Sequence, residues 1–203
     1  MDMDRHWVGL ALIASSADGY IAREDGDISW LTDAPSEPRH VPAHDGPHVP
    51  PDYHEFYASV DHLVIGRGTY EKILTFDSWP YQDKEVIVLS TTLTEGSDAN
   101  ITVARSVHTV VQLLAARKAR RVYADGGKVI QSFLRHGLLD ELTVSVAPVL
   151  LGGGLPLFGK LDRDVRLIHL GSATGDTGMV TSHYAVAGTT YRAFPPQRVD
   201  DQR

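Results

Sequence analysis

The stretch Arg121–Leu134, RVYADGGKVIQSFL, decides the fold that the rest of the sequence must accommodate. A short apolar run leads into Gly126 and Gly127, after which apolar residues recur at helical spacing. The pattern predicts a strand, a tight turn and a helix. Adjacent glycines let a ligand approach the backbone, and the first N–H groups of the helix would face it, so the turn could bind a phosphate group. Taken alone, a glycine pair more often marks an ordinary turn.

Length and composition restrict the class of protein. The chain has 203 residues, of which 42% are hydrophobic and 22% charged, which favours one compact domain, expected over residues 1–188, with a polar tail at 189–203. Because there is no cysteine, disulfides, thiolate nucleophiles and cysteine-based zinc sites are excluded. A net charge of −7 argues against a general nucleic-acid surface. No apolar run approaches a membrane span and no signal peptide is evident, so we expect a soluble, cytoplasmic protein.

Other apolar runs predict further strands around this stretch. Residues 7–14, WVGLALIA, are typical of a buried central strand, and residues 62–65 and 85–89 predict two more. After the second strand, Gly66 opens a turn into a helix expected to begin near Thr69 or Tyr70. The third strand ends at the hydroxyl residues Ser90 and Thr91.

The remainder of the chain changes character. In residues 107–116 the apolar positions recur at helical spacing, which predicts a helix. The basic residues that follow, up to Arg121, are interpreted as cations that interact favourably with the negative end of the helix dipole. Runs at 140–151, 165–170 and 179–186 then predict consecutive strands, the last two joined by the turn GSATGDTG. Helices therefore alternate with strands only in the first part, which predicts an α/β fold with a mainly parallel sheet finished by antiparallel strands. Ligands of such folds bind at the carboxyl ends of the strands.

Two segments invite a functional interpretation and also have a structural one. Residues 34–51 contain three histidines at every fourth position: His40, His44 and His48. The prolines among them break the helix that would bring these histidines to one face, so no metal site is predicted. Asp52 and Glu55 then form the capping-box pattern of a helix start. Capping alone would account for both carboxylates.

Five motifs occur in order over nearly the whole chain: Ser16-x-Asp18-Gly19-Tyr20-Ile21-Ala22, Ile65-Gly66-Arg67-x-Thr69-Tyr70-Glu71, Val88-Leu89-Ser90, Asp125-Gly126-Gly127-Lys128, and Asp140-Glu141-Leu142 with Pro148-x-Leu150-Leu151-Gly152 and Pro156-Leu157-Phe158. The set resembles the dihydrofolate reductase-like family, specifically the reductase domain at the C-terminus of the riboflavin-biosynthesis deaminase-reductase. The resemblance implies a three-layer sandwich with a mixed, mostly parallel sheet, helices on both faces and antiparallel C-terminal strands. Asp125 departs from dihydrofolate reductases, which usually have glycine there.

The resemblance also implies NADPH as the cofactor. It assigns the adenosine half and its phosphates to the turn after residues 62–65 and to the end of the strand at residues 85–89. The pyrophosphate is assigned to the glycine pair. The nicotinamide is assigned to the strand at residues 7–14 and the loop after it. The cofactor-binding residues expected on this basis are Ala14, Ile21, Ala22, Gly66, Arg67, Thr69, Ser90, Thr91, Asp125, Gly126, Gly127, Lys128 and Val129.

The expected function is reduction of a small molecule, with the hydride donated by NADPH to a pteridine-like or ribosylamino-pyrimidine substrate. The alternatives are dihydrofolate reductase activity and a non-catalytic NADPH-binding module. Family members carry a single acid on the helix before the I-G-R-x-T motif, so Asp52 and Glu55 are the candidate catalytic residues, with capping as the favoured alternative. Relatives commonly associate through their C-terminal strands, which predicts a homodimer.

Overall fold

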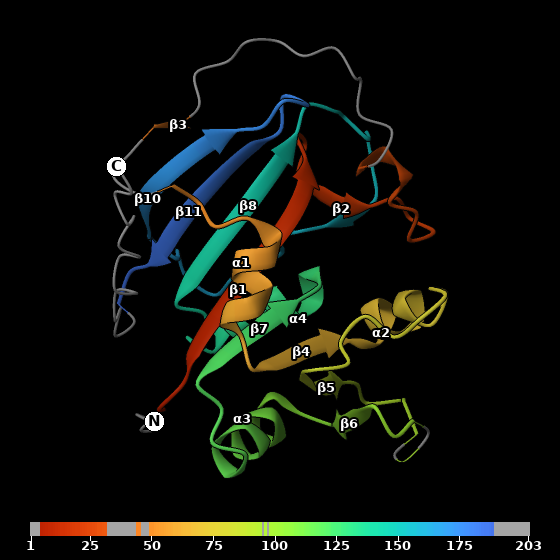
Figure 1. Ribbon diagram of the computed structural model, residues 1–203. Coiled ribbons are helices and arrows are strands. Elements are labelled where there is room, and N and C mark those ends of the chain that lie inside the picture. The colour runs from red at the N-terminus through yellow and green to blue at the C-terminus, as the bar shows by residue number, and fades with distance from the viewer. Residues whose placement is uncertain (1–4, 32–43, 46–48, 95, 97, 189–203) are drawn as a thin grey trace, which may run out of the picture.

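A nine-stranded sheet forms the centre of the computed structural model, which describes residues 5–31, 44–45, 49–94, 96 and 98–188 (Figure 1). Its order is β3 (His44–Asp45), β10 (Leu167–Thr174), β11 (Val180–Val186), β8 (Glu141–Ala147), β1 (Val8–Ser16), β7 (Arg121–Asp125), β4 (His62–Gly66), β5 (Glu85–Leu89) and β6 (Ile101–Ala104). From β8 to β6 all neighbours are parallel, whereas β11 and β10 run antiparallel to theirs. The predicted mixed sheet is confirmed.

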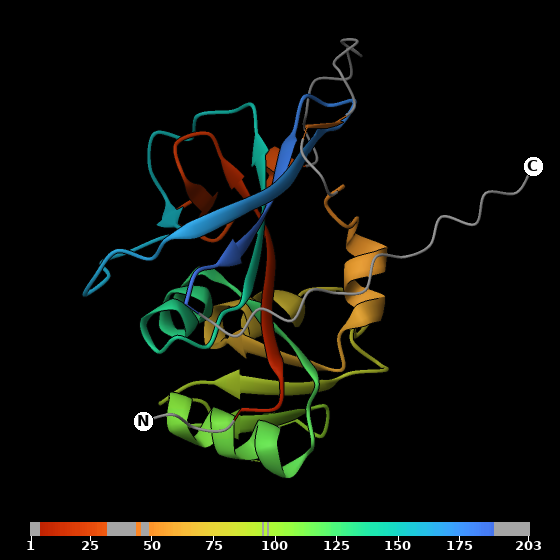
Figure 2. The same cartoon turned by 90° about the vertical axis from the view of Figure 1, so that its left-hand side faces the viewer.

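Helices cover both faces of this sheet. They are α1 (Tyr53–Ser59), α2 (Arg67–Ile73), α3 (Val107–Ala116) and α4 (Gly127–Arg135), with a 3-10 turn at Ser29–Leu31. Figure 2 shows α1 on one side of the sheet and α4 on the other. A small second sheet joins β2 (Tyr20–Ala22) to β9 (Leu155–Pro156).

Each face has its own apolar core because successive side chains of a buried strand point to opposite faces. One core combines strand residues with side chains of α3 and α4: Val64, Ile87, Val122, Val110, Leu114, Ile130 and Phe133. The other combines the alternate strand residues with α1 and α2: Leu63, Ile65, Val88, Tyr123, Phe56, Tyr70 and Ile73. Two cores around one sheet make the three-layer sandwich that the family resemblance implies.

Asp140 ties the start of the central strand to the start of β8. It is 2% exposed, and its carboxylate accepts hydrogen bonds from the backbone N–H of Gly9 at 2.7 Å and from the Arg5 guanidinium at 2.6 Å. A buried carboxylate needs such partners because it has lost its water. The Asp140-Glu141-Leu142 motif thus has a structural role at the amino ends of the strands.

Three element predictions are corrected. Helix α2 begins at Arg67 instead of near Thr69, since Gly66 has an extended backbone and serves as the N-cap. Strand β6 is not predicted from the sequence, because ITVA is too short a run to stand out from a loop. Strand β10 extends through Thr174 into the segment expected to be a turn, with an irregularity between His169 and Gly171 that accommodates the extra residue.

The remaining expectations concern the basic residues after α3, the segments outside the described residues, and membrane spans. Arg121, expected to favour the end of the preceding helix, belongs to β7, whereas Arg117 is the C-cap residue of α3. Most of the proline- and histidine-rich segment, including His40 and His48, and the tail at 189–203 lie outside the described residues. Within the described residues, no helix has the length and apolar character needed to span a membrane. The single-domain boundary stays a prediction.

Candidate active site

The glycine pair forms a turn that has no room for side chains. Gly126 is the N-cap of α4 with φ of 88°, a left-handed backbone conformation that favours glycine. A Cβ atom on Gly126 would lie 2.5 Å from Thr69 Oγ1, and one on Gly127 would lie 2.9 Å from the carbonyl oxygen of Pro156. The turn therefore presents bare backbone at the N-terminus of a nine-residue helix, where an anion is favoured.

The loop after β1 lies against this turn. Ile21 Cδ1 would be 3.1 Å from a Cβ atom on Gly127, and β2 is held in place by its pairing with β9. Ala22 is buried in β2, while Ala14 lies in β1 opposite Ser145 of β8. The structure thus brings Ile21 and Gly127 into proximity, although more than a hundred residues separate them in the chain.

On the other side, the start of α2 meets the start of α4. Thr69 reaches Gly126, and Val129 Cγ2 would lie 3.6 Å from a Cβ atom on Gly66. Lys128, in contrast, is exposed in the first turn of α4. The turns at Gly66 and Gly126 therefore lie side by side at the carboxyl ends of β4 and β7.

Arg67 spans from this turn to the end of β5. Its guanidinium donates to Thr92 Oγ1 at 2.8 Å and pairs with Glu71 at 2.8 Å, with half of the side chain exposed. Ser90 is buried, and its hydroxyl accepts from the backbone N–H groups of Thr92 and Leu93, so it shapes the loop after β5. Thr91 is exposed beside it.

Arg105 also belongs to this region, although the sequence pattern does not predict it. Arg105 follows β6 and donates from its guanidinium to the carbonyl of Ser90 at 3.0 Å. Two arginines from different strand ends thus converge on the loop after β5. Recognising β6 as a strand would have identified Arg105, because a cation directly after a parallel strand lies at the ligand-binding edge.

Asp125 brings a carboxyl group to the same edge. It ends β7, remains partly accessible, and accepts a hydrogen bond from the backbone N–H of Gly126 at 2.8 Å. Desolvation raises the pKa of Asp125 to about 6, and the bonds from Gly126 and Tyr123 only partly oppose this effect. Such a group exchanges a proton near neutral pH, which is the property that general acid catalysis requires.

Three tyrosines lie near this carboxyl group. Tyr123 comes from β7 itself, and its hydroxyl donates to the carbonyl of Leu12 at 2.8 Å. Burial raises the pKa values of Tyr53, Tyr81 and Tyr123, and the nearby charge of Asp125 raises all three further. The tyrosines stay neutral, so Asp125 is the group among them that titrates near pH 6.

Asp52 and Glu55 are engaged in a capping box at the start of α1. The N–H of Glu55 donates to Asp52 Oδ1 at 2.8 Å, and the N–H of Asp52 donates to Glu55 Oε2 at 3.4 Å. Both side chains are exposed. The structure therefore contains the capping arrangement that was the alternative interpretation, and it places a different carboxylate, Asp125, beside the glycine turn. The catalytic role of Asp52 and Glu55 remains an untested prediction.

The described residues hold no group of three or more His, Asp or Glu side chains close enough to bind a metal ion. His44 lies in β3, and the two other histidines of its segment fall outside those residues.

Comparisons with known proteins identify the family and the fold. The model of the family described as RibD C-terminal domain matches residues 7–181. A crystal structure from Shewanella sp. PV-4, assigned provisionally to riboflavin biosynthesis, is 33% identical, covers 88% of this chain and 98% of its own, and has a TM-score of 0.74. The uncharacterized protein YwjB of Bacillus subtilis (strain 168) is 33% identical over 76% of this chain and 84% of its own length.

A dihydrofolate reductase from Enterococcus faecalis, complexed with NADP(H), has the same fold at 18% identity, with a TM-score of 0.62 over 90% of this chain and 98% of its own. The family model matches most of the length of this chain, and the order of motifs and the three-layer sandwich agree with that match. The chain therefore belongs to the RibD C-terminal domain family and has the dihydrofolate reductase-like fold.

Proposed function

We propose that this protein is an NADPH-dependent reductase that acts on a pteridine-like or ribosylamino-pyrimidine substrate. The proposal rests on two neighbouring features: the turn of Gly126 and Gly127, whose residues carry no side chain, and a carboxyl group of pKa about 6 directly before it. Family membership supports a role related to the reductase domain of riboflavin biosynthesis.

The residues present suit a dinucleotide phosphate. Gly126 and Gly127 would hold the pyrophosphate at the N-terminus of α4, where the first N–H groups of the helix favour an anion. Arg67, with half of its side chain exposed, would bind a phosphate of the adenosine half together with the hydroxyl residues after β5. Ala14, Ile21 and Ala22 would pack against the nicotinamide. When bound, NADPH would supply the hydride.

Asp125 would supply the proton that accompanies reduction. Its carboxyl group is partly protonated near neutral pH because desolvation favours the neutral form. Tyr53, in the first turn of α1, is 47% exposed and lies near enough to Asp125 for that charge to raise the pKa of the tyrosine, so a ring binding beside α1 would approach the carboxyl group. The chain would thus hold the substrate ring, exclude water from it and donate a proton to it.

A substrate panel tests the proposal. We expect loss of NADPH absorbance with 5-amino-6-ribosylaminouracil, assayed with and without its 5′-phosphate, and slower or no loss with dihydrofolate. Faster turnover of dihydrofolate would favour the dihydrofolate reductase alternative. Tight NADPH binding in a calorimetric titration without oxidation by any substrate would favour the non-catalytic module.

Cofactor preference should depend on Arg67. We expect Arg67→Ala to weaken NADPH binding about tenfold, because a charge-assisted bond to a phosphate is lost, and to leave NADH binding nearly unchanged. Lys72→Ala, which removes an exposed cation from the other end of the same helix, is the matched control. Equal affinity of the wild type for both cofactors would contradict a 2′-phosphate site.

The C-terminal strands suit self-association. Leu167, Ile168 and Val180 of β10 and β11 are 41%, 55% and 41% exposed, so these strands leave apolar side chains uncovered. We therefore expect a homodimer at micromolar concentration in sedimentation velocity, and we expect Ile168→Asp to shift it toward monomer. A wild-type monomer under these conditions would refute the assembly.

A further inference from the structure

A cavity of about 560 Å³ lies at the amino ends of β5 and β6, where Glu85, Val86 and Thr102 line it. The candidate active site is at the opposite ends of these strands. In the sheet register, Asp125 lies beside Ile65, and Ile65 lies beside Val88. With about 3.3 Å per residue and about 4.8 Å between strands, the cavity is on the order of 12 Å from Asp125. It is therefore a separate site.

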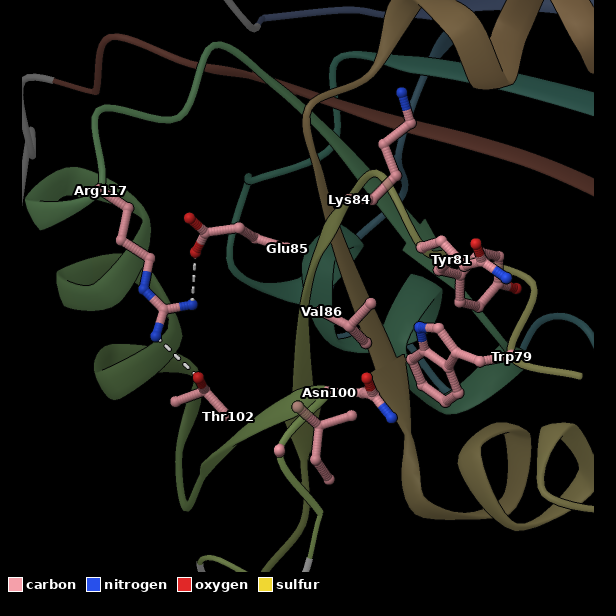
Figure 3. A pocket seen from close by; sticks show the side chains of 11 residues that line it. Trp79, Tyr81, Lys84, Glu85, Val86, Asn100, Thr102 and Arg117 are labelled. Carbon is pink, nitrogen blue, oxygen red and sulfur yellow. Dashed lines mark hydrogen bonds and ion pairs between the residues drawn. The ribbon is translucent and has the colours of Figure 1, made fainter.

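One wall of this cavity is an ion pair fixed from two strands. Arg117, at the end of α3, pairs with Glu85 of β5 at 2.9 Å and donates to Thr102 Oγ1 of β6 at 2.7 Å, as Figure 3 shows. The side chains of Arg117 and Glu85 are 27% and 58% exposed. These bonds occupy only part of the five donors of the guanidinium and the lone pairs of the carboxylate. The wall therefore offers donors and acceptors next to each other.

The opposite wall is aromatic. Trp79 and Tyr81 lie across Val86 from the ion pair (Figure 3), and their rings meet edge to face at 5.7 Å. Tyr81 is buried and Trp79 is half-buried, so the indole is supported from behind. Asn100 is exposed at the rim and adds an amide, which both donates and accepts. A flat ring can stack here and form hydrogen bonds at its edge.

The charges of the cavity favour a neutral ligand. Lys84 also lines it, but its ammonium group pairs with Asp83 at 3.0 Å and lies over the Tyr57 ring, and Figure 3 shows it pointing away. Both cations of the lining thus already have a carboxylate partner. An anion would gain little from Arg117 while Glu85 stays beside it, whereas an adjacent N–H and C=O of a ring matches that pair of residues without adding charge.

We propose that this cavity binds a neutral, planar heterocycle with an amide-like edge, whose ring stacks on Trp79 and whose adjacent N–H and C=O meet Glu85 and Arg117. The proposal does not depend on the reductase activity, because Trp79, Glu85 and Arg117 take no part in the candidate active site; Tyr81, which packs against the indole, lies between the two sites.

Lumazine, a fused ring with such edges, is a suitable probe in calorimetric titrations of the full chain. Lumazine is a pteridine and would also enter the candidate active site, so the binding assigned to this cavity is the component that depends on its own residues. For that component we expect saturable binding, weakened about tenfold or more by Trp79→Ala, as loss of ring stacking requires, and similarly by Arg117→Met. Arg120→Met removes a neighbouring arginine with 88% of its side chain exposed and should leave the affinity unchanged.

The charge of the ligand is tested with lumazine-6-carboxylate, which should bind no more tightly than lumazine. Absence of saturable lumazine binding, or equal affinity in the Trp79, Arg117 and Arg120 variants, would overturn the site, and tighter binding of the carboxylate would overturn the ligand class. Arg117→Met replaces a side chain at the surface end of α3, so the test stands even where Trp79→Ala lowers stability. No readout depends on turnover, so failure of the reductase proposal would be seen separately.

Discussion

Asp125→Asn should lower turnover of the reductase substrate by about a hundredfold or more, since a positioned general acid contributes roughly 10²- to 10⁴-fold to a rate. The variant keeps the size of the side chain and an oxygen that can accept the Gly126 N–H, so the glycine turn and NADPH affinity should persist. Single-turnover rates and a cofactor titration separate the two effects. A variant with wild-type turnover would exclude Asp125 as the proton donor.

The pH dependence of this loss has a defined sign. Because the protonated carboxyl group is the donor, the wild-type rate should fall as pH rises through about 6, the pKa of Asp125, and the fall should disappear in Asp125→Asn. Asp52→Asn is the matched control. It also removes one carboxylate charge near α1 but keeps an N-cap side chain, so near-wild-type turnover is expected. A large rate loss in that variant would instead support the catalytic interpretation of Asp52.

Asp125→Asn should raise the free energy of unfolding at neutral pH, although it lowers turnover. Burial raises the pKa of Asp125 from 3.8 to about 6, so the folded chain holds this proton more tightly than the unfolded chain. The stabilisation from this group is complete below about pH 4 and is lost as pH rises through about 6. Asp125→Asn removes that loss, so at pH 7 its free energy of unfolding should exceed the wild-type value by at most about 2 to 3 kcal/mol. Urea unfolding at pH 4 and pH 7 measures the difference.

Asp140→Ala should lower the free energy of unfolding by about 3 to 5 kcal/mol, the range for breaking a buried ion pair. The substitution leaves the N–H of Gly9 without its acceptor and the Arg5 guanidinium without its carboxylate, both at the start of the central strand. Urea unfolding with an unchanged m-value is the measurement. Asp140→Asn keeps an acceptor for Gly9 and should lose less. A loss below about 1 kcal/mol for Asp140→Ala would contradict its anchoring role.

The sequence predicts those parts of the site that depend on short-range pattern. The strand, glycine turn and helix around Gly126 are contiguous, and the capping box needs only Asp52 and Glu55 three residues apart. The surroundings of Asp125 could not be predicted in this way, because Tyr53 and Tyr81 come from separate segments, and the desolvation that raises the pKa of Asp125 depends on how the chain packs around it. Arg105 was missed for a related reason, since its position follows from the short strand β6.

The position of β1 at the middle of the sheet has a kinetic consequence. Val8 pairs with Arg121 of β7, and Leu10 pairs with Glu141 of β8, so β1 has no neighbour in the sheet until the ribosome has passed β7. Until then its apolar side chains have no sheet to enter, and loop closure over that span costs entropy before any pairing compensates for it. Such non-local parallel pairing is expected to make folding slow, on the order of milliseconds to seconds or longer. The nascent chain would therefore expose WVGLALIA to chaperones for most of its translation.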